Sequence, residues 1–179
     1  FIEEGITPST ESLLSALEYL KSNKGILFTL PTSKDQLVLK EKKLNGHTEF
    51  FRKYFEKPDI TMMFCGPSMN ALLVTDHLPL LDVTEAITTD LIEAKVNLSL
   101  KYLSKINTVV FSGINPHVGE NGLLGSGDER IIEAGKNLSS KHPKITFKGP
   151  LSGDTLHNFC SLENLLVYMA HDQGLAPFK

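Results

Sequence analysis

The sequence NALLVTDH, residues 70–77, decides the fold, because an apolar run of strand length leads directly into a polar loop with a histidine. The same pattern returns in TVVFSGINPH, residues 108–117, and in LLVYMAH, residues 165–171. Short apolar runs bounded by Gly, Pro or polar residues are typical of strands buried on both faces of a sheet. The three runs therefore predict three strands, each followed by a histidine.

Amphipathic segments between these runs predict the rest of the architecture. We expect helices over residues 7–22, 47–55, 89–103 and 129–138, and further strands over residues 26–30, 61–65 and 145–147. Strands and helices in alternation indicate an α/β fold with a mainly parallel sheet. The Gly66-Pro67 turn is too short for a crossover helix, so strands 61–65 and 70–75 should be antiparallel and the sheet mixed.

Side-chain spacing also predicts the buried face of two helices. The helix over residues 47–55 should bury Phe50, Phe51 and Phe55. The helix over residues 89–103 has its apolar residues in phase at Leu91, Ala94, Leu98 and Tyr102.

The composition excludes several classes of protein. Among 179 residues, Lys and Arg number 18 and Asp and Glu 21, so the formal charge is −3 and we expect no nucleic-acid partner. The apolar runs are far too short to span a bilayer, so we expect no membrane partner either. Cys65 and Cys160 do not make a disulfide framework and are predicted to be small core residues of a cytoplasmic protein.

Three of the six histidines share one setting, just beyond the end of an apolar strand: His77, His117 and His171. Ligands of open α/β sheets bind in the crevice beyond the carboxyl ends of the strands. Three imidazoles brought together there can bind a divalent metal and leave positions open for substrate. Asp76 and Asp172 adjoin two of them and could orient their rings. The alternative is that all three are ordinary loop histidines, as we expect for His142 and His157.

Two further segments contain residues suited to anions. His47 and Thr48 stand at the start of a predicted helix, where free backbone N–H groups suit a phosphate or carboxylate; a plain helix cap is the alternative. Lys34 and Lys179 are candidate anion clamps, or else solvated surface lysines. The glycine-rich residues 119–127 match neither a phosphate-binding P-loop nor a dinucleotide fingerprint, so we expect a flexible loop there.

In order along the chain, six motifs resemble the 4-hydroxythreonine-4-phosphate dehydrogenase family of pyridoxal phosphate biosynthesis. The resemblance runs from about Pro8 to Lys179. Its motifs are TLPTSK (29–34), GHTEF (46–50), TDHLPL (75–80), GINPHVGENG (113–122), GPLSGDT (149–155) and HDQGLAPFK (171–179).

The resemblance implies the isocitrate/isopropylmalate dehydrogenase-like fold, with two α/β/α domains per subunit in a homodimer whose active site is shared between subunits. Residues 1–179 would then be the central part of such a subunit, comprising the metal-ligand and dimer-interface domain. The resemblance implies that the N-terminal and C-terminal parts of the family fold would be absent from this chain. No residue of this segment is therefore assigned to the dinucleotide.

The resemblance also implies roles for particular residues. Three histidines match the ligands of a divalent metal (zinc, magnesium or cobalt): His77, His117 and His171. Three further residues match the family's substrate-binding positions: His47, Thr48 and Lys179. Asp154 matches an active-site, catalytic aspartate.

The implied reaction is NAD- or NADP-dependent oxidation of 4-phosphooxy-L-threonine, a phosphorylated hydroxy amino acid, followed by decarboxylation to 3-amino-2-oxopropyl phosphate. Ser152 and Gly153 replace the family's usual Pro-Ala before Asp154, which leaves the substrate open. One alternative is a sister dehydrogenase of a threonate or erythronate phosphate. Another is an inactive, truncated relative that acts as a binding module.

Overall fold

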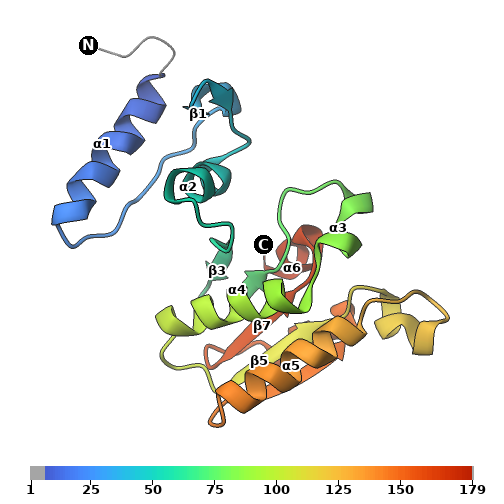
Figure 1. Cartoon of the computed structure of the whole chain (residues 1–179). Coiled ribbons are helices and arrows are strands. Elements are labelled where there is room, and N and C mark those ends of the chain that lie inside the picture. The colour runs from blue at the N-terminus through green and yellow to red at the C-terminus, as the bar shows by residue number, and fades with distance from the viewer. Residues whose placement is uncertain (1–6, 179) are drawn as a thin grey trace. The chain divides into compact units, whose positions relative to one another are not determined.

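The computed structural model describes residues 7–178, with residue 34 described by its backbone alone. The chain divides into two compact units, Phe1–Ile60 and Thr61–Lys179 (Figure 1). Within residues 7–178, no helix is long and apolar enough to cross a membrane.

The first unit is built from two helices and a short hairpin. It contains α1 (Pro8–Ser22), η1 (Lys34–Gln36), the antiparallel strands β1 (Val38–Leu39) and β2 (Lys42–Lys43), and α2 (His47–Phe55). The Thr7 side chain accepts a hydrogen bond from the Thr10 amide, as expected of a residue that caps α1. The predicted bounds of both helices are confirmed. The core of this unit consists of Leu13, Leu17, Leu37, Leu44 and Phe50.

Two predictions in this unit are wrong. Residues 26–30 do not form a buried strand, and Ile26, Phe28 and Leu30 are 80%, 87% and 82% exposed. A strand needs a neighbour for its backbone hydrogen bonds, and none pairs with this segment in the described part of the chain. Of residues 26–30, only Leu27 packs against the core of the unit. Phe55 is 46% exposed because it is the last residue of α2.

The second unit contains a five-stranded mixed sheet. Its strands are β3 (Met63–Cys65), β4 (Asn70–Leu73), β5 (Thr108–Ser112), β6 (Thr146–Leu151) and β7 (Asn164–Tyr168), in the order β3-β4-β7-β5-β6. The β3–β4 pair is antiparallel and the other pairs are parallel. The predicted mixed, mostly parallel sheet is confirmed, with the last strand along the chain between β4 and β5.

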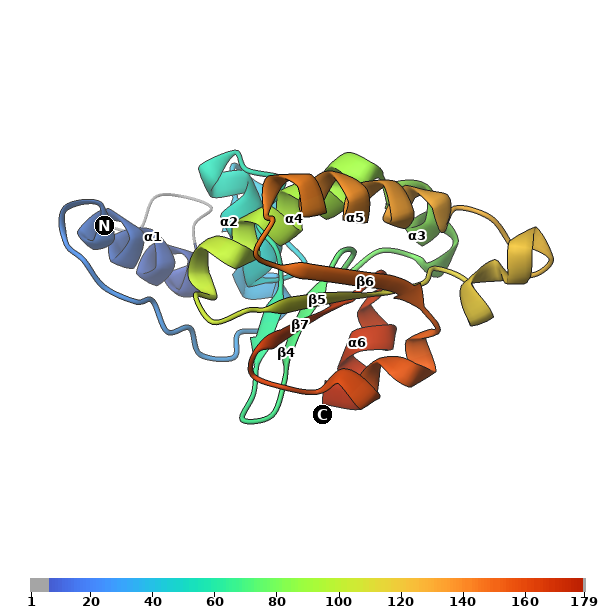
Figure 2. The ribbon, with the colours of Figure 1, turned by 90° about the horizontal axis from the view of Figure 1, so that it is seen from below.

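Helices cover both faces of this sheet (Figure 2). The helices α3 (Leu80–Ala86), α4 (Thr89–Tyr102) and α5 (Glu129–Lys141) share a core with one face. On the other face lie α6 (His171–Phe178) and the short η3 (Gly153–Phe159). Successive strand residues alternate between the two cores, as the pleat requires: Leu165 and Val167 join the first, and Leu166 and Tyr168 the second.

The buried face of α4 differs from the predicted one. Tyr102 is 77% exposed, whereas Ile92 and Val96 are fully buried. The helix is turned so that Glu93 faces α5, where Lys141 Nζ lies 2.5 Å from the carboxylate and Asn137 Nδ2 lies 2.6 Å from it. These polar contacts accompany burial of the face of α4 that contains Ile92 and Val96. The spacing of apolar residues alone did not reveal this face.

Both cysteines are exposed, so the prediction that they are core residues is wrong. Cys65 ends the edge strand β3, and Cys160 follows η3 in a loop. Each therefore lies at the margin of the sheet rather than between its layers.

Gly174 allows α6 to lie close against the sheet. A Cβ atom at this position would lie 2.5 Å from Leu73 Cδ2 and 3.0 Å from Tyr168 Cδ2. Both neighbours are fully buried and have no room to move. Gly135 of α5 also faces the sheet, but a Cβ there would meet only Phe111, at an ordinary 3.7 Å.

We predict opposite effects for alanine at these two helical glycines. Gly174→Ala should lower the free energy of unfolding by about 1–3 kcal/mol, because overpacking displaces β4 and β7. Gly135→Ala should raise it by roughly 0.5–1 kcal/mol, because alanine loses less backbone entropy in a helix. Urea denaturation of both variants checks this, and equal effects would contradict the close packing of α6.

Candidate functional site

The segments that contain the three candidate histidines leave the same edge of the sheet. Strands β4, β7 and β5 are adjacent and parallel, so their carboxyl ends coincide. His77, His171 and His117 follow these three strands in that order. The three histidines therefore follow strands that end at one common edge.

His77 and His171 lie side by side at this edge. Their ring centroids are 5.2 Å apart, and both residues line a cavity of about 330 Å³. His171 Nδ1 lies 2.6 Å from the carboxylate of Asp172. When Nδ1 of a neutral imidazole donates to a carboxylate, Nε2 has the lone pair that can bind a metal. The Asp76 carboxylate accepts a hydrogen bond from the His77 amide, which shapes the turn.

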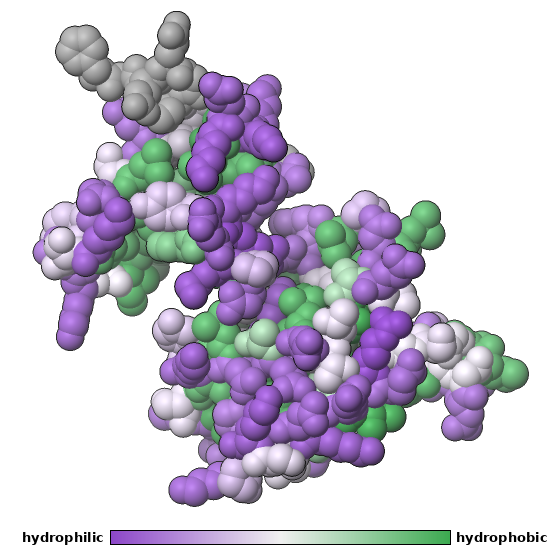
Figure 3. All heavy atoms as spheres, in the orientation of Figure 1, coloured by the Kyte–Doolittle hydropathy of each residue, from purple (hydrophilic) through white to green (hydrophobic). Residues whose placement is uncertain are grey.

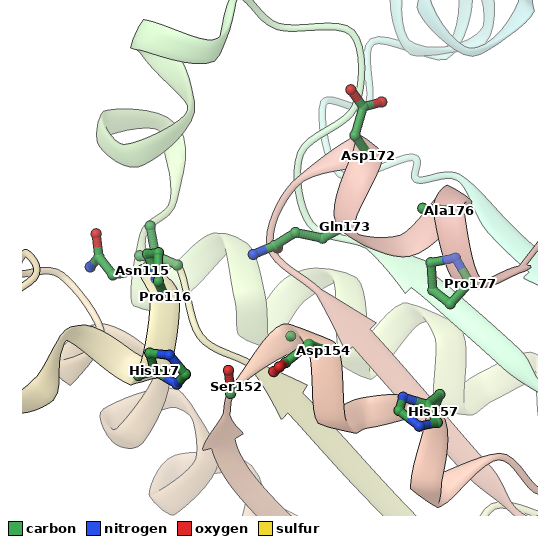
Figure 4. Close-up of a pocket in the computed structure, with 12 residues that line it drawn as sticks. Asn115, Pro116, His117, Ser152, Asp154, His157, Asp172, Gln173, Ala176 and Pro177 are labelled. Carbon is green, nitrogen blue, oxygen red and sulfur yellow. The ribbon is translucent and has the colours of Figure 1, made fainter.

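His117 lies in a second, adjoining cavity of about 590 Å³ (Figure 4). Asp172 lines both cavities, whereas His77 and His171 line only the smaller one. Among the described residues, no group of three His, Cys, Asp or Glu side chains is arranged to hold a metal. One chain thus brings His77 and His171 together and places His117, the third predicted ligand, in the adjoining cavity.

Asp154 lies in the larger cavity with its carboxylate between two histidines (Figure 4). A hydrogen bond from Ser152 holds the pKa of this carboxyl below its ordinary value, and the nearby imidazoles of His117 and His157 lower it further. Asp154 is therefore a carboxylate at neutral pH. Such a group can hold a hydroxyl or a cation of a ligand, but it is a weak proton acceptor.

Two residues of this cavity were not recognised from the sequence. His157 was predicted to be a surface or turn residue; it is exposed as predicted, and it also lines this cavity from η3. Gln173 ties two strand ends together: its Nε2 donates to the Gly113 carbonyl at 3.0 Å, and its Oε1 accepts from the Ala170 amide at 3.0 Å. The sequence offered no signal for His157, because η3 has no apolar periodicity. For Gln173, a polar residue in the first turn of α6 shortly beyond β7, that position was the available clue.

The other predicted binding residues belong to the first unit or lie outside the described part. His47 begins α2 and lines a cavity of about 480 Å³ together with Thr29 and Pro31. Gly46 is the N-cap of α2, and no side chain caps the helix there, so neither His47 nor Thr48 acts as a plain cap. The Lys34 side chain and Lys179 lie outside the described residues.

The backbone around His117 is left-handed. In η2 (Pro116–Gly122), five successive residues have φ between 43° and 72°. Each L-residue in this conformation costs about 1–2 kcal/mol, and only Gly119 escapes that cost. Val118 is β-branched, which makes its φ of 56° a clear outlier. Strain of this kind persists only where surrounding contacts impose it, and it is concentrated at functional sites.

Comparisons with known proteins agree with the fold and with the motifs. The family model of the pyridoxal phosphate biosynthetic protein PdxA matches residues 4–179. The crystal structure of a 4-hydroxythreonine-4-phosphate dehydrogenase from Burkholderia phymatum superimposes with a TM-score of 0.64 at 32% identity, over 75% of this chain and 42% of that one.

Two curated relatives have names for two different activities. A 4-hydroxythreonine-4-phosphate dehydrogenase from Hydrogenobaculum is 32% identical over 99% of this chain and 59% of its own length. A D-threonate 4-phosphate dehydrogenase from Cupriavidus necator is 34% identical over 84% of this chain and 47% of its own length. The chain thus spans about half the length of the curated relatives that it matches.

We predict that Gln173→Ala loosens the loops of His117 and His171 together. Loss of the amide leaves the Gly113 carbonyl and the Ala170 amide without this partner, at a cost of about 1–3 kcal/mol. Hydrogen exchange at the Ala170 amide should accelerate more than exchange in α5. Asn158→Ala, which changes an exposed amide next to His157 in the sequence, serves as the control. Unchanged exchange at Ala170 would show that Gln173 does not hold the strand ends.

Proposed function

The chain belongs to the PdxA family of pyridoxal phosphate biosynthetic proteins, and from this premise we propose that it is part of a metal-dependent dehydrogenase of a phosphorylated hydroxy acid. The proposed substrate is 4-phosphooxy-L-threonine. Oxidation of its secondary alcohol with NAD or NADP gives a β-keto acid, which loses CO2 to form 3-amino-2-oxopropyl phosphate. The observation that carries the proposal is the pairing of His77 with His171 at the carboxyl edge of the sheet.

The donor set of this edge fits a divalent metal. Two imidazoles face one another, and one of them is oriented by a carboxylate. Imidazole nitrogens suit zinc or cobalt better than magnesium, which prefers oxygen. We propose that His77, His171 and His117 hold the metal, with His117 supplied from the adjoining cavity. A metal bound there would lower the pKa of the substrate hydroxyl and polarise the ketone that forms.

The remaining site residues hold and orient the substrate in this proposal. His47, Thr48 and Lys179 bind its anionic groups through charge-assisted hydrogen bonds. The Asp154 carboxylate, held ionised by Ser152, accepts a hydrogen bond from a hydroxyl or an ammonium group. His157 faces the same cavity and adds a further hydrogen-bonding group.

The reaction needs a hydride acceptor, which NAD or NADP supplies. No residue of this chain matches a dinucleotide-binding motif. We therefore propose that these 179 residues are the central part of a two-domain subunit, and that other parts of the subunit bind the dinucleotide.

We also propose that the subunit forms a homodimer through α3. Leu80 and Leu81 are 83% and 92% exposed, and Leu80 also lines the cavity of His77 and His171. Hydrophobic surface is visible over α3 in Figure 3. A second subunit against this surface would exclude water from the cavity.

The second candidate function is oxidation of D-threonate 4-phosphate. A relative with that name is as similar to this chain as those named for hydroxythreonine phosphate. The two substrates differ in an ammonium group, which the carboxylates of Asp154 and Asp172 would attract. Comparing kcat/KM for the two substrates separates the candidates.

We predict that His117→Ala abolishes both metal binding and turnover in the full-length protein. Loss of a ligand should reduce zinc affinity by more than the roughly 10–100-fold that loss of an outer-shell partner costs. The measurements are metal content after dialysis and NADH or NADPH formation with 4-phosphooxy-L-threonine. His142→Ala is the matched control, because His142 bonds Asn97 away from both cavities. Unchanged metal and turnover in His117→Ala would refute the proposed site.

We predict that the double substitution Leu80→Asp and Leu81→Asp dissociates the homodimer. Two carboxylates in an apolar interface would each remain desolvated and unpaired. Sedimentation velocity of the full-length protein should show a dimer that the variant converts to a monomer. Tyr102→Asp, at an exposed apolar residue of α4, should leave the dimer intact. A monomeric parent protein, or a variant that remains dimeric, would contradict this interface.

A further inference from the structure

One compact set of hydrogen bonds holds the segments on either side of the left-handed backbone at His117. The Ile114 amide donates to Asp128 Oδ1 at 2.7 Å, and Asn115 Nδ2 donates to Asp128 Oδ2 at 2.9 Å. Asn115 Nδ2 also donates to the Ser126 carbonyl at 2.9 Å. We call the Asn115–Asp128 pair the latch. It joins the residues before the left-handed turn to the residues after it.

Asp128 is in an unusual position for this task. It is the N-cap residue of α5, where an aspartate side chain ordinarily accepts hydrogen bonds from the first turn of its own helix. Its side chain makes no such capping bond. The residue is 7% exposed, and its carboxylate is directed instead at residues 114 and 115. Because α5 is anchored in the core through Ile131, this carboxylate is a rigid support.

The loop packs tightly around the latch. A Cβ on Gly125 would lie 2.3 Å from Asn115 Oδ1, and one on Gly119 would lie 2.6 Å from the Gly125 carbonyl oxygen. The Leu124 amide also donates to the Gly119 carbonyl at 2.9 Å. Positions 119 and 125 therefore leave no room for a side chain beside the latch.

We propose that Asn115 and Asp128 are positioning residues, which hold residues 117–121 left-handed and so direct His117 into the cavity of Asp154. The latch acts on the path of the backbone. Its effect on metal binding rests on the function proposed above. Neither residue touches the substrate in this scheme. Without the latch, Val118 and Glu120 return to ordinary backbone conformations and the His117 side chain leaves the cavity.

The test measures the turn and the metal separately in the full-length protein. Asn115→Ala and Asp128→Asn should accelerate hydrogen exchange of residues 117–124 at least tenfold. They should also weaken cobalt binding by roughly 10–100-fold, as loss of an outer-shell partner does, and alter the visible spectrum of bound cobalt. Asn137→Ala, which removes a bond between α5 and α4, controls for general destabilisation. It should leave exchange of this turn and the cobalt spectrum unchanged.

A second substitution, at Val118, should partly restore the properties that Asn115→Ala loses. Such recovery is not expected if Asn115 only makes an ordinary structural contact. Glycine adopts the left-handed conformation without steric cost, so Val118→Gly should recover at least half of the exchange protection and cobalt affinity that Asn115→Ala loses. Unchanged exchange in both latch variants, equal acceleration in Asn137→Ala, or no recovery would each overturn the latch. If the parent protein binds no cobalt, the proposed metal function fails while hydrogen exchange still tests the latch.

Discussion

The parallel pairing of β7 between β4 and β5 is the constraint on which the site depends. Backbone register aligns Leu72 with Val167 and Val110 with Leu166. Buried hydroxyl groups extend this alignment beyond the strands: Thr75 Oγ1 donates to the Met169 carbonyl at 2.7 Å, and Ser112 Oγ accepts from the Met169 amide at 3.1 Å. Three loops therefore begin from one fixed edge, and their histidines are confined to adjoining cavities.

The residues after β7 show how closely fold and site are joined. His171 faces His77, and Asp172 orients its ring. Gln173 ties the ends of β5 and β7, and Gly174 allows the helix to lie against the sheet. Four successive residues thus have four different physical tasks. A change at any of them would move the cavity, although only the first two present polar groups to the cavity of the paired histidines.

Predictions from the sequence succeeded where neighbouring residues along the chain determine the structure. They failed where contacts with residues far away in the sequence determine it. The helices over residues 8–22 and 47–55 and the antiparallel β3–β4 pair are confirmed. The helices α3 and α6 were not recognised, because α3 has seven residues and α6 contains Pro177, a poor helix former. The buried face of α4 depended on Lys141, which lies on another helix.

By itself, the sequence determined that apolar strands end in loops with histidines, because strand length, apolar runs and turn residues are local properties. It also determined the family, because six short motifs occur in order. Only the tertiary structure decided that His77 meets His171 while His117 joins Asp154 and His157. Strand order and the left-handed turn at residues 117–121 set those distances. Both arise from hydrogen bonds between residues far apart along the chain, which no local pattern encodes.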